Sequence, residues 1–245
     1  MIIITGAGQG IGAAVARRAA DLGRPVCVNY RSSAEGAARV VDDLRRSGVE
    51  AMAVRADVAE EDEVERLFAT AEEELGPLTA LVNNAGVTGG MARVADLDIA
   101  QLDTAYRAVL RSVALCTRRG LRSMARGRGG AGGSIVNISS TGARTGGGHE
   151  WVHYAALKAA VNVHTWGAAQ EAAADDVRVN AVAPGLIDTG LHRANGVPDR
   201  PDRLRPTVPL GRIGTPEEVA EAVVFLLSPA ASYITGSVLE VGGGR

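Results

Sequence analysis

Short apolar segments alternate with longer segments of helical pattern along the whole chain, and this alternation limits the fold more than any other feature. Strands that are apolar nearly throughout, each followed by a helix, are typical of a parallel sheet covered by helices on both faces. We therefore predict an α/β fold with a doubly wound, seven-stranded parallel sheet flanked by helices. The predicted strands are 2–5, 26–29, 51–54, 78–82, 134–139, 177–182 and 237–241, and the predicted helices are 11–22, 33–47, 60–75, 98–125, 151–174 and 215–228.

The 245 residues contain no linker and no shift in composition, so we predict a single domain, 1–245. The segment 186–209 differs from the rest, because it follows the sixth predicted strand and carries glycine and several prolines. In an open α/β sheet, ligands bind beyond the carboxyl ends of the strands. A long segment at that place is typical of a substrate lid, and we predict one over 186–209.

The composition argues against several classes of protein. The formal net charge is −2, and the arginine-rich stretch 118–128 is short and broken by glycines, so we expect no binding of nucleic acid. The chain begins without the pattern of a signal peptide, and no apolar run approaches the roughly 20 residues of a membrane span, so we expect a soluble protein with no membrane contact. Only two cysteines occur, and neither is predicted to form a disulfide, so we expect a cytoplasmic location. Cys27 and Cys116 lie in apolar runs and are predicted to be buried thiols. No cluster has metal-ligand spacing, so no metal is predicted.

The first predicted strand runs directly into the sequence Thr-Gly-Ala-Gly-Gln-Gly-Ile-Gly, residues 5–12, which is followed by an alanine-rich helix. A glycine turn between a strand and a helix presents backbone N–H groups and the positive end of the helix to a pyrophosphate. A plain glycine-rich turn is the alternative, but the strand before the turn and the helix after it favour a dinucleotide site. The fold is therefore predicted to be of the Rossmann type.

Further motifs follow in a defined order, and together they cover essentially the whole chain. With the Thr-Gly-x-x-x-Gly-x-Gly loop, they resemble the short-chain dehydrogenase/reductase family in its compact single-domain branch. The motifs are Asp57-Val58 after the third strand, Asn83-Asn84-Ala85-Gly86 after the fourth, Ser139-Ser140 after the fifth, Tyr154-Ala-Ala-Leu-Lys158 in the next helix, Pro184-Gly185 with Thr189 after the sixth, and Tyr233-Ile-Thr-Gly236 with Gly242-Gly243 near the end.

The resemblance implies a set of cofactor-binding residues. Three glycines of the loop would hold the pyrophosphate, Asp57 would bind the adenine amino group beside Val58, and Asn83 with Gly86 would line the ribose side. Ile187 and Thr189 would hold the nicotinamide carboxamide. Taken from the residues alone, Asp57 is better explained by a turn or a helix cap. The implied set is Gly6, Gln9, Gly10, Ile11, Gly12, Tyr30, Arg31, Ser32, Asp57, Val58, Asn83, Ala85, Gly86, Tyr154, Lys158, Pro184, Gly185, Ile187 and Thr189.

The end of the second predicted strand favours NADP(H) over NAD(H). Enzymes of this architecture that use NAD offer an acid to the ribose hydroxyls about 20 residues past the glycine loop. Here the strand ends in Asn-Tyr-Arg-Ser-Ser, and no carboxylate occurs until Glu35. Arg31 is suited to a 2′-phosphate, although an ordinary exposed arginine is the alternative. Many relatives that use NADP carry a basic residue in the glycine loop, where this chain has Gln9, so use of NAD(H) as well stays open.

The predicted catalytic residues are Ser140, Tyr154 and Lys158. Tyr154 and Lys158 are spaced i, i+4, so they lie on the same side of one helix. A neighbouring ammonium lowers the pKa of a phenol from its usual value near 10, and we expect this for Tyr154. Tyr154 would then be the general acid in carbonyl reduction and the base in alcohol oxidation, while Ser140 would stabilise developing alkoxide charge. Taken alone, such residues are more often a helix surface and a turn.

One position departs from the family pattern. The family usually has an asparagine in the helix before the fifth strand, where it helps to anchor a water beside the lysine; the matching stretch here is Val109-Leu110-Arg111-Ser112. A valine side chain holds no water. The predicted function is therefore an oxidoreductase that moves a hydride between nicotinamide and a small ketone, aldehyde or secondary alcohol. The alternative is a weakly catalytic sensor or partner subunit of the same fold.

The helix predicted over 151–174 is apolar on more than one face, which indicates contact with a second subunit as well as with the sheet. The family resemblance suggests a homotetramer, or a dimer. Four residues near the expected substrate site are candidates for substrate contact, although an ordinary loop role is the more frequent one for each. They are His149, Trp151, His153 and His192.

Overall fold

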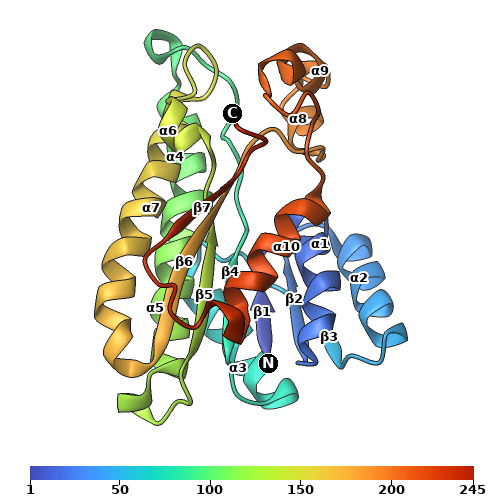
Figure 1. The fold of residues 1–245 in the computed structure, drawn as a ribbon, viewed down its shortest axis with the longest axis vertical. Helices are drawn as coiled ribbons and strands as arrows, with labels where there is room; N and C mark the ends of the chain where they lie inside the picture. Colours follow the sequence, from blue (N-terminus) through green and yellow to red (C-terminus); the bar gives the residue numbers. More distant parts are fainter.

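The computed structural model describes residues 1–245, except for the side chains of residues 192 and 193. Seven strands form one parallel sheet in the order β3-β2-β1-β4-β5-β6-β7, and Figure 1 shows the helices on its two sides. The order reverses between β1 and β4, and such a switch point is where open α/β sheets bind ligands. The strands are β1 (Ile2–Ile4), β2 (Val26–Tyr30), β3 (Ala51–Arg55), β4 (Ala80–Asn83), β5 (Gly133–Ile138), β6 (Val177–Pro184) and β7 (Val238–Val241).

Alternate residues of the strands build two separate cores, one on each face of the sheet. In β1, Ile2 and Ile4 pack against the helices α1 (Gly10–Ala19), α2 (Ala34–Arg46) and α10 (Pro216–Leu227). Ile3 points the other way, into the core made with α3 (Glu61–Leu75), α5 (Ser112–Met124) and α7 (Val152–Ala172). Burial of β-branched residues on both faces explains why these strands are apolar throughout.

The remaining helical elements are short and lie in the connections. The α-helices among them are α4 (Ile99–Tyr106), α6 (Gly142–Thr145), α8 (Leu191–Ala194) and α9 (Arg200–Leu204), and a π-helix, η3, spans Arg107–Arg111. Single 3-10 turns occur at Ala20–Leu22, Val94–Asp96, Arg126–Arg128, Ala173–Asp175, Arg205–Thr207 and Pro229–Ala231.

The predicted fold class is confirmed, and each predicted strand ends within two residues of the observed one. The structure differs from the prediction in two places. The helix expected over 98–125 is interrupted by the π-helix, and the hydroxyl of Ser112 donates to the carbonyl of Ala108 within it at 2.7 Å. The segment 186–209 contains α8 and α9, which are too short to give a periodic sequence pattern.

Two expectations about the chain as a whole can be compared with the fold. Cys27 and Cys116 are buried free thiols, as predicted, and burial raises the pKa of each to about 12. Within the part of the chain that the structure describes, no helix is both long enough and apolar enough to cross a bilayer.

Candidate active site

The glycine loop after β1 is braced by side chains that hold its backbone. The amide of Asn84 donates to the carbonyls of Thr5 (2.9 Å) and Gly6 (3.1 Å), and Asn29 accepts from the Gly6 N–H at 3.2 Å. The hydroxyl of Thr5 accepts from the N–H groups of Asn84 and Ala85. Neither Asn29 nor Asn84 was among the predicted site residues. Asn29 lies near the carboxyl end of the apolar strand β2, and Asn84 directly follows β4; a polar residue at the end of an apolar strand is the signal that could have identified them.

The shape of this loop fits a diphosphate. Gly6 and Gly10 have positive φ values of 62° and 55°, a region that L side chains rarely adopt. A Cβ on Gly12 would lie 2.7 Å from the carbonyl oxygen of Gly6 and would also overlap the amide of Asn84. The helix α1 begins at Gly10, and the preceding Gln9 gives it no side-chain cap. Backbone N–H groups at the start of a helix are suited to an anion, so this cradle fits the pyrophosphate of a dinucleotide.

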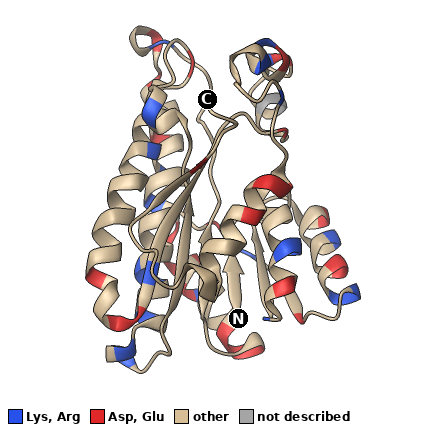
Figure 2. Cartoon of the chain, viewed as in Figure 1, with Lys and Arg blue, Asp and Glu red and all other residues tan. Residues whose placement is uncertain are grey.

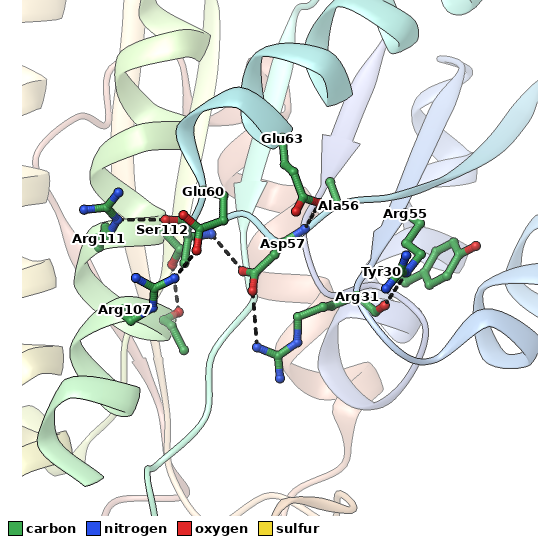
Figure 3. A network of polar contacts seen from close by, with 12 residues as sticks. Tyr30, Arg31, Arg55, Ala56, Asp57, Glu60, Glu63, Arg107, Arg111 and Ser112 are labelled. Carbon is green, nitrogen blue, oxygen red and sulfur yellow. Dashed lines mark hydrogen bonds and ion pairs between the residues drawn. The ribbon is translucent and has the colours of Figure 1, made fainter. Parts of the chain in front are cut away.

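Arg31 and Asp57 face each other across the ends of β2 and β3 (Figure 3). The Arg31 guanidinium lies 3.6 Å from the Asp57 carboxylate, and 60% of the Arg31 side chain is exposed. The other oxygen of Asp57 accepts from the N–H of Ala59 at 3.0 Å, and Glu63 accepts from the N–H of Asp57 at 2.8 Å. The Asp57 carboxylate is therefore well oriented, whereas Arg31 is held by a long, exposed ion pair that contributes little to stability.

The other residues predicted at this end have more varied settings. The side chain of Val58 is buried in the core between the sheet and α3, so only its backbone can face a ligand. Tyr30 is half-buried at the end of β2, and Ser32 is exposed in the turn that follows.

Asn83 has a different setting from the residues that follow it. Its side chain does not face the cradle: the amide nitrogen donates to Thr117 (3.1 Å) and to Asn137 (2.8 Å) inside the core beneath α5 and α7. Asn83 follows Leu81 by two residues, so both side chains point to the same face of β4, and Leu81 belongs to that core. Any contact of Asn83 with a ribose therefore has to come from its backbone. Ala85 lies against Gly6, and Gly86 lies beside Lys158 and Val109.

Tyr154 and Lys158 lie one turn apart on α7, beside the end of β5. The Lys158 ammonium lies 5.6 Å from the centre of the Tyr154 ring and donates to the carbonyl of Ile138 at 2.5 Å. Ser139 donates to the Lys158 carbonyl at 3.2 Å and so ties β5 to this turn. Ser140 comes next, and its hydroxyl accepts from the N–H of Gly142 at 3.0 Å. The hydroxyl of Ser140 thus keeps its own proton for another acceptor.

The electrostatics differ from the expectation for Tyr154. Burial raises the pKa of the Tyr154 phenol above its ordinary value, and burial lowers the pKa of Lys158 to about 8. Sequence reasoning included the attraction between phenolate and ammonium but could not include the loss of water around both groups. The protein's own surroundings therefore keep the phenol neutral, and a neutral phenol carries the proton that carbonyl reduction consumes.

Val109 lies at the expected place beside the lysine. It is fully buried in the π-helix, and a Cβ built on Gly86 would lie 3.7 Å from Val109 and 3.9 Å from the Lys158 ammonium. The hydroxyl of Ser112 donates to the carbonyl of Ala108, which lies in the π-helix, so this carbonyl has a side-chain partner. The surroundings of Lys158 on this side are more apolar than an asparagine would make them.

The chain after β6 returns over the glycine loop. The carbonyl of Pro184 accepts from Thr141, and the N–H of Gly185 donates to Val241 in β7, each at 2.9 Å. Ile187 is buried and forms a bridge with Gly214. A Cβ on Gly10 would lie 3.7 Å from the methyl group of Thr189. Thr189 therefore lies close to the start of α1.

The four residues considered for substrate contact have different settings. Trp151 and His153 are buried next to Tyr154, whereas His149 is exposed and has a φ of 67°. The side chain of His192 lies outside the described residues.

A glycine cradle at the switch point of a parallel sheet, with a Tyr–Lys pair on the neighbouring helix, defines a nicotinamide-dependent oxidoreductase of the Rossmann type. The family model described as Enoyl-(Acyl carrier protein) reductase matches residues 6–245. The chain belongs to the short-chain dehydrogenase/reductase family, whose members act on CH–OH or C=O groups with NAD(P).

Similar proteins agree with this assignment over the whole length. The chain is 43% identical to cis-4-hydroxycyclohexanecarboxylate dehydrogenase of Sinomonas cyclohexanicum, covering 99% of this chain and 94% of the relative. It is 39% identical to the uncharacterized oxidoreductase YgfF of Escherichia coli (strain K12), covering 99% and 98%. A solved structure of 7α-hydroxysteroid dehydrogenase, complexed with NADH and 7-oxo glycochenodeoxycholic acid, is 34% identical with a TM-score of 0.91, covering 99% and 92%.

Proposed function

We propose that this protein catalyses hydride transfer between NADP(H) and a small ketone, aldehyde or secondary alcohol, with Tyr154 as the proton donor and acceptor. The single observation that carries the proposal is the placement of Tyr154 and Lys158, one turn apart on α7, against the end of β5 that carries Ser140. The bound dinucleotide would supply the hydride. NAD(H) is proposed as a second, less favoured cofactor.

Each catalytic residue has a separate task in this proposal. The Ser140 hydroxyl donates to the substrate oxygen and stabilises the negative charge that develops there during reduction. Tyr154 gives its proton to the same oxygen, or removes it when an alcohol is oxidised. Lys158 holds the nicotinamide ribose and, when charged, stabilises the phenolate that remains after proton transfer. Because burial lowers the pKa of Lys158 to about 8, the charge of the lysine near neutral pH depends on the groups bound next to it.

The proposed cofactor site follows the cradle from end to end. Gly6, Gly10 and Gly12 leave room for the pyrophosphate at the start of α1, and Asp57 orients the adenine. Arg31 leaves its loose ion pair with Asp57 for the 2′-phosphate of NADP, because a guanidinium forms paired hydrogen bonds with phosphate oxygens. Ile187 and Thr189 bind the carboxamide from the segment 186–209, which we propose acts as the substrate lid.

The similar proteins point to a first group of substrates to test. The relative from Sinomonas cyclohexanicum is named for a ring-bound secondary alcohol, and the solved structure holds a 7-oxo steroid acid. We propose cyclic ketones and their alcohols, beginning with 4-oxocyclohexanecarboxylate, as the first compounds for assay.

We also propose that the protein assembles as a dimer or a tetramer. The helix α7 has only Lys158 and Glu171 as charged residues, and Figure 2 shows it as a mostly uncharged ribbon on the outside of the molecule. Val163 and Trp166 on this helix are 61% and 46% exposed. A second copy of the chain would remove this apolar surface from water.

A weakly catalytic sensor of the same fold is the second candidate, and Val109 is the observation that favours it. The substitution Tyr154→Phe separates the two candidates. In the proposed enzyme it should lower kcat about 10²- to 10⁴-fold while the Kd for NADPH, measured by fluorescence titration, stays within about twofold. Equal rates for the wild type and this variant would remove Tyr154 as the proton donor.

A further inference from the structure

Segment 186–209 contacts the residues just before Tyr154 through two separate groups of side chains. One contact is made from α9 and involves Glu150 and Trp151. The other is made by Asn195, just after α8, and reaches His153 through Thr88. The residues contacted are therefore four, three and one positions before Tyr154 in the chain. No role in the chemistry proposed above explains this arrangement.

The contact from α9 is a largely buried ion pair, in which the side chains of Arg200 and Glu150 are 10% and 17% exposed. The Nε and Nη2 atoms of Arg200 lie 2.8 Å and 2.7 Å from one oxygen of Glu150, and Arg203 lies 3.5 Å from the other oxygen. Burial alone would raise the pKa of Glu150, but hydrogen bonds and charges from Arg200 and Arg203 hold it below its ordinary value. An ion pair enclosed in this way is strongly coupled, because removing one partner leaves the other charge buried and unpaired.

Arg200 is also the first of three side chains that contact one another in series, through Trp151 to Tyr154. Its guanidinium lies 4.1 Å from the centre of the Trp151 ring. The Trp151 and Tyr154 rings are 6.4 Å apart and meet edge to face at 71°. A guanidinium over an indole and two rings in this geometry are both favourable contacts with a defined direction. Trp151 therefore links the Tyr154 ring to Arg200 of α9.

The second contact fixes the backbone beside the same tyrosine. A ring nitrogen of His153 is 2.8 Å from the Thr88 carbonyl, and the hydroxyl of Thr88 donates to the amide oxygen of Asn195. Asn195 in turn donates to Leu191 in α8 at 2.7 Å. Thr88 and His153 are both buried, so this link crosses the interior rather than the surface.

We propose that docking of α9 positions the catalytic phenol, with Glu150, Trp151 and Arg200 as positioning residues; this inference depends on the function proposed above. With α9 docked, the contacts from Arg200 through Trp151 hold the Tyr154 ring in one orientation beside Lys158. With α9 undocked, the ring has one neighbour fewer and the phenol is less often in place. Closing of segment 186–209 over a substrate would then also complete the proton donor.

The substitution Arg200→Lys tests the proposal, because lysine keeps the charge but loses the planar fork and most of the stacking. We expect kcat to fall about tenfold, with the KM for NADPH within about twofold of the wild type. The deuterium isotope effect on kcat, measured with 4-deuterated NADPH, should increase because the chemical step becomes slower than product release. A loss of folded protein alone would not change the isotope effect. Trp151→Phe keeps a ring and should retain more activity than Trp151→Ala.

Limited proteolysis gives a readout that needs no activity. Trypsin can cut at the Arg203–Leu204 bond in α9, whereas a proline follows both Arg200 and Arg205 and protects those bonds. Arg200→Lys should be cut about tenfold faster at 203 than the wild type. The matched control is Arg205→Lys, an exposed position in the same segment, which should change neither the cutting rate nor kcat.

The outcomes separate this inference from the proposed function. A wild type that oxidises no NADPH with any carbonyl substrate removes the proposed function and this inference with it. An active wild type, combined with an Arg200→Lys variant that keeps kcat, the isotope effect and the cutting rate, overturns the inference and leaves the function in place. Faster cutting with unchanged kcat shows that the ion pair holds α9 without positioning Tyr154, and this also overturns it.

Discussion

The two sides of the site are held in different ways. The dinucleotide side, formed by residues 5–12, 29–36 and 84–86, is fixed through its backbone: the carbonyls and N–H groups of the loop are bound by asparagine and threonine side chains. The side proposed for the substrate, formed by 86–92, 147–153 and 186–209, is joined mainly by contacts between side chains, including a largely buried ion pair, a guanidinium over an indole and an edge-to-face ring pair.

This difference matches what each side has to do. A pyrophosphate is always the same, so a rigid cradle of backbone N–H groups loses nothing by having one shape. Substrates enter and leave, so the groups above them need contacts that can break and reform. The glycine loop should therefore be intolerant of small additions of volume. An open position on the substrate side should tolerate them, and that side should be sensitive to loss of a specific partner.

The largest effect is expected from one methyl group on the dinucleotide side. Gly12→Ala would bring a Cβ to 2.7 Å from the Gly6 carbonyl and into the Asn84 amide, so the loop has to move. We expect about 1–3 kcal/mol of lost stability and at least about tenfold weaker binding of NADPH, measured by thermal unfolding and by titration.

The matched change on the substrate side is Gly148→Ala, where a Cβ would meet nothing within 4 Å. It should leave both stability and kcat close to those of the wild type. Equal damage from the two substitutions would break the contrast between the two sides.

An effect on one cofactor only, without a loss of stability, is expected at Arg31, the loosely held residue of the dinucleotide side. Arg31→Ser removes the partner proposed for a 2′-phosphate and should raise the KM for NADPH about 10- to 100-fold, the value of one charge-assisted hydrogen bond. The KM for NADH should change less than twofold, since NADH has no 2′-phosphate. Arg39→Ser, on the exposed face of α2, is the control. Similar increases for both cofactors would show that Arg31 acts only through its contact with Asp57.

The sheet could be predicted closely, because burial on both faces leaves long apolar runs between helices. The predicted strand at 26–29 and the observed β2 differ by one residue for this reason. The glycine loop was also predicted to lie between a strand and a helix, and the structure has it between β1 and α1. Short helices such as α8 and α9 could not be predicted, since they are stabilised by distant partners.

Other parts of the site depend on contacts that only the folded chain reveals. Glu150 and Arg200 are 50 residues apart, and neither has an unusual local sequence. The pKa values of Tyr154 and Lys158 depend on burial, which spacing along a helix does not report. The face on which the Asn83 side chain lies can be read from the sequence, because alternation along β4 places it on the same side as Leu81.

Lys158, between the two sides, should give a stability effect that depends on pH. Its pKa is lowered from 10.5 to about 8, so between these values the unfolded chain binds more protons than the folded one. The contribution of this group to the free energy of unfolding should therefore rise with pH. The destabilisation caused by burying the ammonium is fully present below pH 8. Lys158→Met lacks this group and does not gain stability in this way. Its free energy of unfolding, relative to that of the wild type, should therefore fall by about 2 kcal/mol as pH rises from 7 to 9.5, measured by urea unfolding. A difference in the free energy of unfolding that is constant over this range would show that burial does not lower the pKa of Lys158.

The smallest expected effect on turnover concerns Val109, which lies where the two sides meet, beside Gly86 and Lys158. Asparagine at this position would add a polar group next to the ammonium, so Val109→Asn should keep or raise kcat. The same change places an amide at a fully buried position and should lower stability by about 1–3 kcal/mol. The matched control is Val113→Asn, also buried and one turn further along, which should lose similar stability without any gain in kcat per folded molecule. A severe loss of kcat in Val109→Asn alone would show that the apolar contact itself supports Lys158, and that this enzyme needs no polar group at that position.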